Sequence, residues 1–219
     1  MQSPLELNKL GLLLANVNGS RPSQDLALKY AEVHGVHIVC LTEPHLHQGT
    51  ISPTPGWKVV ATAHSAILIN KNINPDNMIT QDNFSVLVQF GNIHICCAYV
   101  SPNHPPERVL DTLYRETNNR GNMVLAGDFN CRLPWLTTDT IRPRDREFIN
   151  FVLNTGVQVE NDSTPTCYHQ GRPSVNDYVL TKNTVVEQWR VLTNEESLSD
   201  HKYVVADIQL GSNTMVQNR

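Results

Sequence analysis

The sequence has no apolar run close to the length of about 20 residues that a helix needs to cross a bilayer. We therefore predict no membrane span. The N-terminal stretch MQSPLELNKLGLLLANV lacks a basic n-region and carries Glu6, so we expect a first core strand there and not a signal peptide. Internal repeats and low-complexity tracts are absent as well. These features predict a single domain over residues 1–210, followed by a polar tail at 211–219.

Cysteine patterns typical of disulfide frameworks or zinc sites are also missing. The five cysteines have no CxxC or CxxxxC spacing, and three of them lie in apolar, strand-like runs. We expect reduced thiols in an intracellular protein. The nine histidines include the pairs His34/His37 and His45/His47, but no pair of cysteines accompanies them. The sequence therefore does not favour a zinc site.

The chain lacks the excess of basic charge that is usual in proteins that bind nucleic acids. It has 17 Lys and Arg against 21 Asp and Glu, which gives a formal net charge of −4. A metal-dependent site concentrates carboxylates, and a local basic face can coexist with an acidic total. Net charge alone leaves the class of partner open.

The sequence does contain a succession of short apolar runs, within 219 residues of which 40% are hydrophobic. Residues 36–43 (VHIVCLTE) are typical of a strand buried on both faces, and 85–100 predict a hairpin that turns at Gly91-Asn92. Helical spacing predicts helices from Ser20 to Gly35, over 105–118 and over 143–154. The other predicted strands are 11–17, 64–70, 123–129, 176–181, 187–192 and 202–210. We predict a strand-rich α/β or α+β domain with two sheets and helices outside them.

Polar residues of a particular kind recur where these predicted strands begin or end. Each one alone is more often a turn former or a helix cap. Six such sets are harder to explain in that way, because loops at strand ends are where a rigid scaffold presents chemistry. The sets are Asn16 with Asn18, Glu43, Tyr99 with Ser101 and Asn103, Asp128 with Asn130, Asp177, and Asp200 with His201.

The residue types in these sets fit the hydrolysis of a phosphate ester. Glu43 with Asn16 offers hard oxygen ligands of the kind that Mg²⁺ prefers. His201 can donate to a phosphoryl oxygen, and a carboxylate such as Asp177 can fix its tautomer. Asp128 can accept a proton from water. These parts together fit an in-line attack in which a metal stabilises the developing charge.

The motifs ANVNG, LTEPH, AYVSPN, GDFN, SVNDYVL and LSDH stand in the order and rough spacing of the endonuclease/exonuclease/phosphatase superfamily. That superfamily includes exonuclease III, apurinic endonucleases and DNase I. More narrowly, NVNG, EPH, STPTC and WRVLTNEESLSDH resemble the endonuclease domain of non-LTR (LINE-type) retrotransposons. The resemblance covers roughly residues 10–210, and the combination of GDFN with a downstream SDH is much more specific than GDFN alone.

This resemblance implies a four-layer sandwich, in which helices flank two packed mixed β-sheets as in DNase I. It also implies a DNA endonuclease that depends on Mg²⁺, with Mn²⁺ able to substitute. The enzyme would nick one strand of double-stranded DNA in the nucleus and leave a 3′-hydroxyl that primes reverse transcription. The tail at 211–219 would lead to a reverse transcriptase domain of the same polyprotein.

The resemblance also implies roles for individual residues. Glu43, Asn16 and Asp200 would hold the metal. Thr166 would contact the phosphate, and Ser199 would help to hold the loop before the last strand. Tyr99 would contact the scissile phosphate, Asp128 would activate or position the attacking water, and Asn130 would orient both. Asp177 would pair with His201, which would contact the phosphate.

Candidate DNA contacts lie in loops around these residues. Segment 131–147 carries Arg132, three further arginines and Trp135. Arginine can bind phosphates or enter a narrow minor groove, but acidic neighbours make a solvated helix entrance an equal alternative. His169 and Arg172 lie in CYHQGRPS, which predicts a hairpin that could insert into a groove.

Departures from the family pattern leave two alternatives open. Asn18 stands where apurinic endonucleases usually carry an aspartate. This difference argues against a function in the repair of abasic sites. The motifs GDFNCR and PSVNDYVL partly resemble those of inositol polyphosphate 5-phosphatases. In the second motif, however, Val175, Asn176 and Tyr178 replace the expected tryptophan, cysteine and arginine. A phosphatase acting on a small phosphorylated molecule is one alternative. A DNA-targeting module that does not cut is the other, although the intact catalytic residues argue against it.

Overall fold

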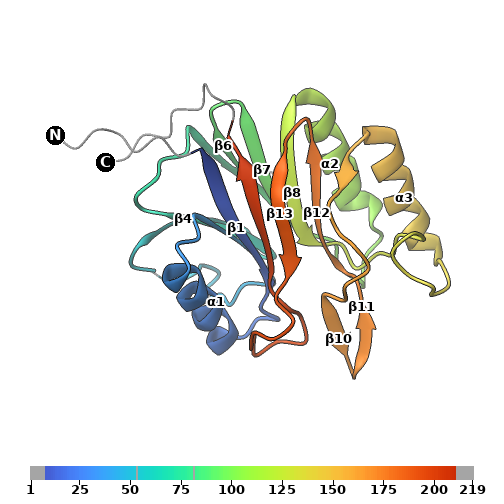
Figure 1. The fold of residues 1–219 in the computed structure, drawn as a ribbon, viewed down its shortest axis with the longest axis horizontal. Coiled ribbons are helices and arrows are strands. Elements are labelled where there is room, and N and C mark those ends of the chain that lie inside the picture. The colour runs from blue at the N-terminus through green and yellow to red at the C-terminus, as the bar shows by residue number, and fades with distance from the viewer. Residues whose placement is uncertain (1–7, 53, 81, 211–219) are drawn as a thin grey trace.

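The computed structural model describes residues 8–52, 54–80 and 82–210, and these residues form two packed six-stranded sheets with helices outside them (Figure 1). Helix α1 covers one side of the pair, while α2 and α3 cover the other. The four-layer sandwich predicted from the sequence is confirmed. The predicted tail at 211–219 lies outside the described residues.

The first sheet combines strands from both ends of the chain, in the order β13-β14-β1-β2-β4-β3. Strands β1 and β2 are parallel, and every other neighbouring pair in this sheet is antiparallel. Helix α1 (Arg21–Val33) begins after Ser20, whose side chain accepts a hydrogen bond from the Ser23 N–H. The strands are β1 (Lys9–Asn16), β2 (Ile38–Thr42), β3 (Trp57–Ala61), β4 (Ser65–Asn70), β13 (Val186–Val191) and β14 (Val204–Gln209).

The second sheet has the order β5-β6-β7-β8-β12-β9. Here β7 and β8 are the parallel pair. Helices α2 (Glu107–Asn119) and α3 (Pro143–Thr155) pack on its outer face. The strands are β5 (Asn77–Thr80), β6 (Ser85–Phe90), β7 (Ile93–Tyr99), β8 (Asn122–Asp128), β9 (Gln158–Val159) and β12 (Asp177–Lys182).

A small hairpin of β10 (Cys167–His169) and β11 (Arg172–Ser174) projects from the body of the molecule, beyond the two sheets (Figure 1). The sequence predicted this hairpin, the hairpin at 85–100 and the three helices, and all of them are confirmed within one to three residues at most ends. Three strands were not predicted, namely β3, β5 and β9. All three occupy sheet edges, and β9 is only two residues long.

Alternation along β1 shows how the layers are held together. Leu12 and Leu14 face the second sheet and join the apolar cluster between the sheets, whereas Leu13 and Ala15 pack toward α1. Because the strand is buried on both faces, its sequence is continuously apolar and does not alternate with polar residues. No helix among the described residues is long and apolar enough to cross a membrane.

The arrangement of strands brings the polar strand ends to one rim. The parallel strands β1, β2, β7 and β8 all end at this rim, where Asn16 of the first sheet bonds to Asp128 of the second. The antiparallel strands β12 and β14 begin there. Residues far apart in the sequence therefore meet where the carboxyl ends of four strands and the amino ends of two coincide.

Candidate active site

Asp128, Asp177 and His201 form a buried cluster at this rim. Asp128 ends β8 and Asp177 begins β12, and the two are direct partners across the antiparallel pair. Nδ1 of His201 lies 2.8 Å from Oδ2 of Asp177, and Nε2 lies 3.9 Å from Oδ2 of Asp128. All three are at least nine-tenths buried. Because Asp177 holds Nδ1, the Nε2 edge of the imidazole faces Asp128.

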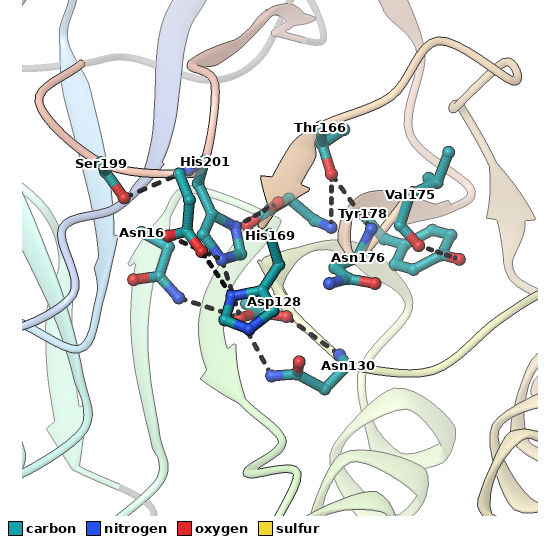
Figure 2. A network of polar contacts seen from close by, with 12 residues as sticks. Asn16, Asp128, Asn130, Thr166, His169, Val175, Asn176, Tyr178, Ser199 and His201 are labelled. Atoms are coloured by element: carbon teal, nitrogen blue, oxygen red, sulfur yellow. Dashed lines mark hydrogen bonds and ion pairs between the residues drawn. The ribbon is translucent and has the colours of Figure 1, made fainter. Parts of the chain in front are cut away.

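Asn16 joins the two sheets at the centre of the site. Its Nδ2 donates to Oε1 of Glu43 and to Oδ2 of Asp128, each at 2.9 Å. Asn130 adds two donors to Asp128, one from its backbone N–H at 2.9 Å and one from Nδ2 at 3.0 Å. Figure 2 shows the side chains of Asn16 and His201 converging on Asp128. Three N–H groups therefore fix the direction of the Asp128 carboxylate.

Glu43 and Asn130 both adopt left-handed backbone conformations, with φ of 48° in each. For a residue with a side chain this conformation costs about 1–2 kcal/mol, and asparagine bears it more easily than glutamate. In Glu43 the conformation places the side chain against Asn16 directly after β2. Strain of this kind gathers at functional sites, where the surrounding structure holds it in place.

Burial and neighbouring charges shift the pKa values of Asp128 and His201 in the same direction. Burial first, and then repulsion from Asp177, raise the pKa of Asp128 to about 7, against the opposing effects of His201, Asn16 and Asn130. Burial alone would lower the pKa of His201. The charge of Asp177 and its hydrogen bond outweigh burial and raise that pKa to about 12. Near neutral pH, His201 is therefore an imidazolium, while Asp128 lies close to its own midpoint.

Tyr99 ends β7 directly opposite Asp128. Burial, followed by the negative charges of Glu43 and Asp128, raises the pKa of its phenol well above the ordinary value. Tyr99 therefore remains a neutral hydroxyl that can donate a hydrogen bond.

The loop from Ser197 to His201 is held by contacts that the sequence did not reveal. The Ser197 hydroxyl donates to the carbonyl oxygen of His201, and Ser23 of α1 donates to the carbonyl oxygen of Ser197 at 2.6 Å. Within the loop, the Oγ of Ser199 accepts the His201 N–H at 3.2 Å. Only the SDH motif signals this loop in the sequence, because serine is common in any turn.

Thr166 and Asn161 fix the start of β12. The Thr166 hydroxyl is fully buried and accepts the backbone N–H groups of Asn176 and Asp177, each at 3.0 Å. Asn161 donates to the carbonyl oxygen of Asp177 at 2.8 Å. The burial of Thr166 favours an indirect role, through Asp177, over the direct phosphate contact predicted from the sequence. Asn161 was not predicted, since no motif singles it out.

Three of the four arginines of segment 131–147 bind other groups of the protein. Arg132 bonds to the carbonyl oxygen of Thr140 and pairs with Asp139, while Arg142 pairs with the buried Asp145 at 2.7 Å. Arg144 reaches the carbonyl oxygens of residues 101 and 102. These contacts favour the structural alternative for these arginines, Arg132 included, over the DNA contact.

The two candidate DNA contacts on the β10–β11 hairpin are exposed. Arg172 is exposed on β11. His169 is exposed on β10, but its Nδ1 lies 3.1 Å from Oδ2 of Asp200, so the hairpin is tied to the loop that carries His201.

The residues at this rim can hold a metal ion. Asp128, Asp177 and His201 present ligand atoms within 4.8 Å of one another. Oδ1 of Asp177 is buried without a hydrogen-bond partner among the described residues. Asn16 Oδ1 accepts one hydrogen bond, from the Asn18 N–H, and keeps a second lone pair. The histidines of one pair considered for zinc have other contacts. His37 accepts a hydrogen bond from the Gly11 N–H, and His34 stacks on Tyr30.

Two packed mixed sheets, with a buried cluster of carboxylates and histidine at the rim where their strands end, define a hydrolase with the DNase I-like fold. The chain belongs to the endonuclease–reverse transcriptase family, whose family profile matches residues 93–205, just over half of the chain. The chain is also 23% identical over 208 residues to the RNA-directed DNA polymerase from the mobile element jockey of Drosophila funebris. That match covers 86% of this chain but 22% of the relative, so the chain spans about a fifth of the relative's length.

Among solved structures, the chain resembles the endonuclease domain of TRAS1, a telomere-specific non-LTR retrotransposon. The TM-score is 0.79 at 19% identity, and the match covers 93% of this chain and 100% of that one. This likeness shows the fold. Together with the family it supports a nuclease role for the domain.

Proposed function

We propose that the protein is a Mg²⁺-dependent DNA endonuclease that hydrolyses one strand of a duplex and leaves a 3′-hydroxyl. The observation that carries this proposal is the buried group around Asp128, in which Asn16 and Asn130 orient the carboxylate and the Nε2 edge of His201 faces it. Family membership supports a nucleic-acid substrate, because it supports a nuclease role.

Glu43, Asn16 and Asp200 would hold the ion, while Asp128, Asp177 and His201, which also lie close enough together to bind one, would act on the water and the phosphate instead. Carboxylate and amide oxygens suit Mg²⁺, which usually takes only one or two protein carboxylates. When bound, Mg²⁺ supplies positive charge that stabilises the negative charge developing on the phosphate oxygens. Mn²⁺, which prefers similar ligands, would substitute for it.

The protein's own groups would move and hold protons around the phosphate. Asp128, with a pKa near 7 and a fixed direction, would accept a proton from the attacking water. His201 is held as an imidazolium by Asp177 and would donate a charged hydrogen bond to a phosphate oxygen. The neutral hydroxyl of Tyr99 would add a second donor, and Asn130 would orient the water and the phosphate.

The β10–β11 hairpin is the main candidate for contacting the duplex outside the cut site. Arg172 is exposed on it, whereas Thr140 and Asp139 engage Arg132, and His169 lies next to Asp200. Arginine can bind the backbone phosphates or enter a narrow minor groove. The hairpin would thus help to place the scissile phosphate over Asp128 and His201.

The proposal extends to the setting of the reaction. The relative from the jockey element is an RNA-directed DNA polymerase, of which this chain matches only a part. We propose that a reverse transcriptase domain of the same polyprotein uses the 3′-hydroxyl as a primer, and that the enzyme acts on DNA in the nucleus.

Nicking of supercoiled plasmid tests the proposal. Wild-type protein should convert the plasmid to open circles with Mg²⁺ and should not do so with EDTA. His201→Ala and Asp128→Ala should be inactive, whereas His34→Gln, which changes an exposed histidine away from the site, should nick normally. If folded wild-type protein fails to nick but releases phosphate from inositol phosphates, the phosphatase alternative replaces this proposal. DNA binding without cutting would favour the targeting module.

A further inference from the structure

One cluster beside the proposed active site combines three different ligand types. The thiol of Cys167, a carboxylate oxygen of Asp200 and a ring nitrogen of His201 lie within 4.8 Å of one another. Cys167 and His201 are also partners in an isolated β-bridge, which fixes their backbones side by side. Cys167 has no part in the chemistry proposed above.

Neighbouring residues hold the other two side chains in the orientation that an ion would need. His169 engages Oδ2 of Asp200 at 3.1 Å, and Asp177 engages Nδ1 of His201 at 2.8 Å. The remaining atoms, Oδ1 of Asp200 and Nε2 of His201, face one another at 4.0 Å. A carboxylate that holds the second nitrogen of a histidine is the usual support of a metal-binding imidazole.

The spacing suits a tetrahedral ion with three protein ligands. Bonds to zinc are about 2.0 Å for nitrogen and oxygen and about 2.3 Å for sulfur, which places tetrahedral ligands roughly 3.3–3.7 Å apart. The Asp200–His201 separation of 4.0 Å lies just above this range, and all three ligand atoms lie within 4.8 Å of one another, so closure of the side chains around an ion would complete the site. Three protein ligands leave the fourth position for water, as in other open zinc sites.

We propose that Cys167, Asp200 and His201 form an inhibitory site for a divalent ion that prefers thiolate, such as Zn²⁺. A thiolate ligand selects such an ion over Mg²⁺, which prefers oxygen. Binding releases the proton of the Cys167 thiol and the proton of the ring nitrogen that it occupies. An ion on Nε2 removes the donor from the phosphate, and an ion on Nδ1 displaces Asp177, so either mode blocks the proposed role of His201.

A binding experiment tests the site without relying on nuclease activity. Cd²⁺ serves as the probe, because a thiolate bound to it gives an ultraviolet charge-transfer absorption. Titration of the wild type should give this band at one equivalent of Cd²⁺, and Cys167→Ser should abolish it. Cys131→Ser, which changes another buried cysteine, should keep it. A band of equal size in Cys167→Ser would overturn the proposal.

Inhibition of nicking tests the consequence, which rests on the proposed function. With Mg²⁺ in excess, the Zn²⁺ concentration that halves the nicking rate should rise about tenfold or more in Cys167→Ser, because changing even the residues that support a metal's ligands costs about 10–100-fold in affinity. Cys167→Ala serves as a second variant if serine disturbs this buried position. Equal sensitivity of wild type and variant would exclude inhibition through this site. Absence of nicking in every protein would overturn the proposed function, while the Cd²⁺ band would still decide the site.

Discussion

Asp128 and Asp177 stand directly opposite each other on neighbouring antiparallel strands, and only Asp177 holds the imidazole of His201 at hydrogen-bond distance. Two carboxylates in register repel each other when both are charged, and at this site the repulsion adds to burial in raising the pKa of Asp128 to about 7. One aspartate is therefore suited to accept a proton, and the other keeps the histidine charged.

The pH dependence of nicking should reflect this division. Because the proposed role of Asp128 needs its charged form, the wild-type rate should rise with pH through about 7. Asp177→Asn removes the repulsive charge and also the partner of His201. Its rate should fall by roughly 10²–10⁴-fold, and the midpoint of its residual activity should move to lower pH. A profile identical to the wild type would contradict the assignment of Asp177.

Asn16 should be needed for activity more than for stability. Asn16→Asp replaces the amide that bridges Glu43 and Asp128 with a third carboxylate, which repels both. We expect nicking to fall by roughly 10²-fold or more, with a loss of about 1–3 kcal/mol in the free energy of unfolding. Nicking rate and urea unfolding measure the two effects separately. Asn18→Asp is the matched control, since Asn18 contacts Asn16 through its backbone N–H.

Gly127 should be irreplaceable for a structural reason. A Cβ at this position would overlap the backbone carbonyl oxygen of Ala98 on the adjacent strand. Gly127→Ala must therefore push β7 away from β8 beside Tyr99 and Asp128. This should lower the free energy of unfolding by about 1–3 kcal/mol or more. Thermal unfolding measures this loss. Gly121→Ala, where a Cβ would meet nothing within 4 Å, should be tolerated.

Acid should destabilise the loop before α3. Burial, the largest influence on Asp145, would raise its pKa, but hydrogen bonds from Arg142 and Arg132 together lower it below the ordinary value. A lowered pKa gives stability that is present above the unfolded-state pKa of about 4, and this stability is lost as pH falls through the folded-state pKa.

Asp145→Asn should therefore be less stable than the wild type by about 1–3 kcal/mol at neutral pH, and the difference should shrink in acid. Urea unfolding across pH measures it. Asp139→Asn, at the exposed partner of Arg132, should change little. A difference for Asp145→Asn that persists unchanged in acid would rule out the charged carboxylate as its source.

DNA affinity should separate the two candidate arginines. Arg172→Ala should weaken binding and reduce the slope of log affinity against log salt by about 1, as expected for the loss of one phosphate contact. Arg132→Ala should leave that slope unchanged, because Asp139 and Thr140 already engage its guanidinium. Fluorescence anisotropy with a labelled duplex at several salt concentrations measures both. Equal slopes in the two variants would remove the hairpin from the proposed interface.

Much of this fold could be predicted because the strands that meet at the site are largely buried and apolar. Strands such as β2 and β8 are buried, so their sequences mark them clearly and place Glu43 and Asp128 just at or after their ends. The edge strands β3 and β5 were missed, because β5 has four residues and β3 is only partly buried after Trp57. Their apolar signal is correspondingly weak.

The contacts within the site were less accessible from the sequence. The motifs identified Asn16 and Thr166 as polar residues near phosphate or metal. They could not show that Asn16 donates to carboxylates on two sheets or that Thr166 is buried under β12. Such contacts depend on how the two sheets pack, and strand patterns carry no information about that. The left-handed backbone of Glu43 escaped prediction for a similar reason, since no residue type at that position signals it.

The first sheet places β14 between β13 and β1, and His201 lies three residues before β14. During synthesis, residues such as Asn16, Glu43 and Asp128 leave the ribosome long before that histidine does. If His201 has the role proposed for it, a nascent chain would gain activity only after β14 has been translated and inserted beside β1. On the proposed function, cutting would therefore begin only once the chain has been made through β14, and shorter products of translation would leave DNA intact.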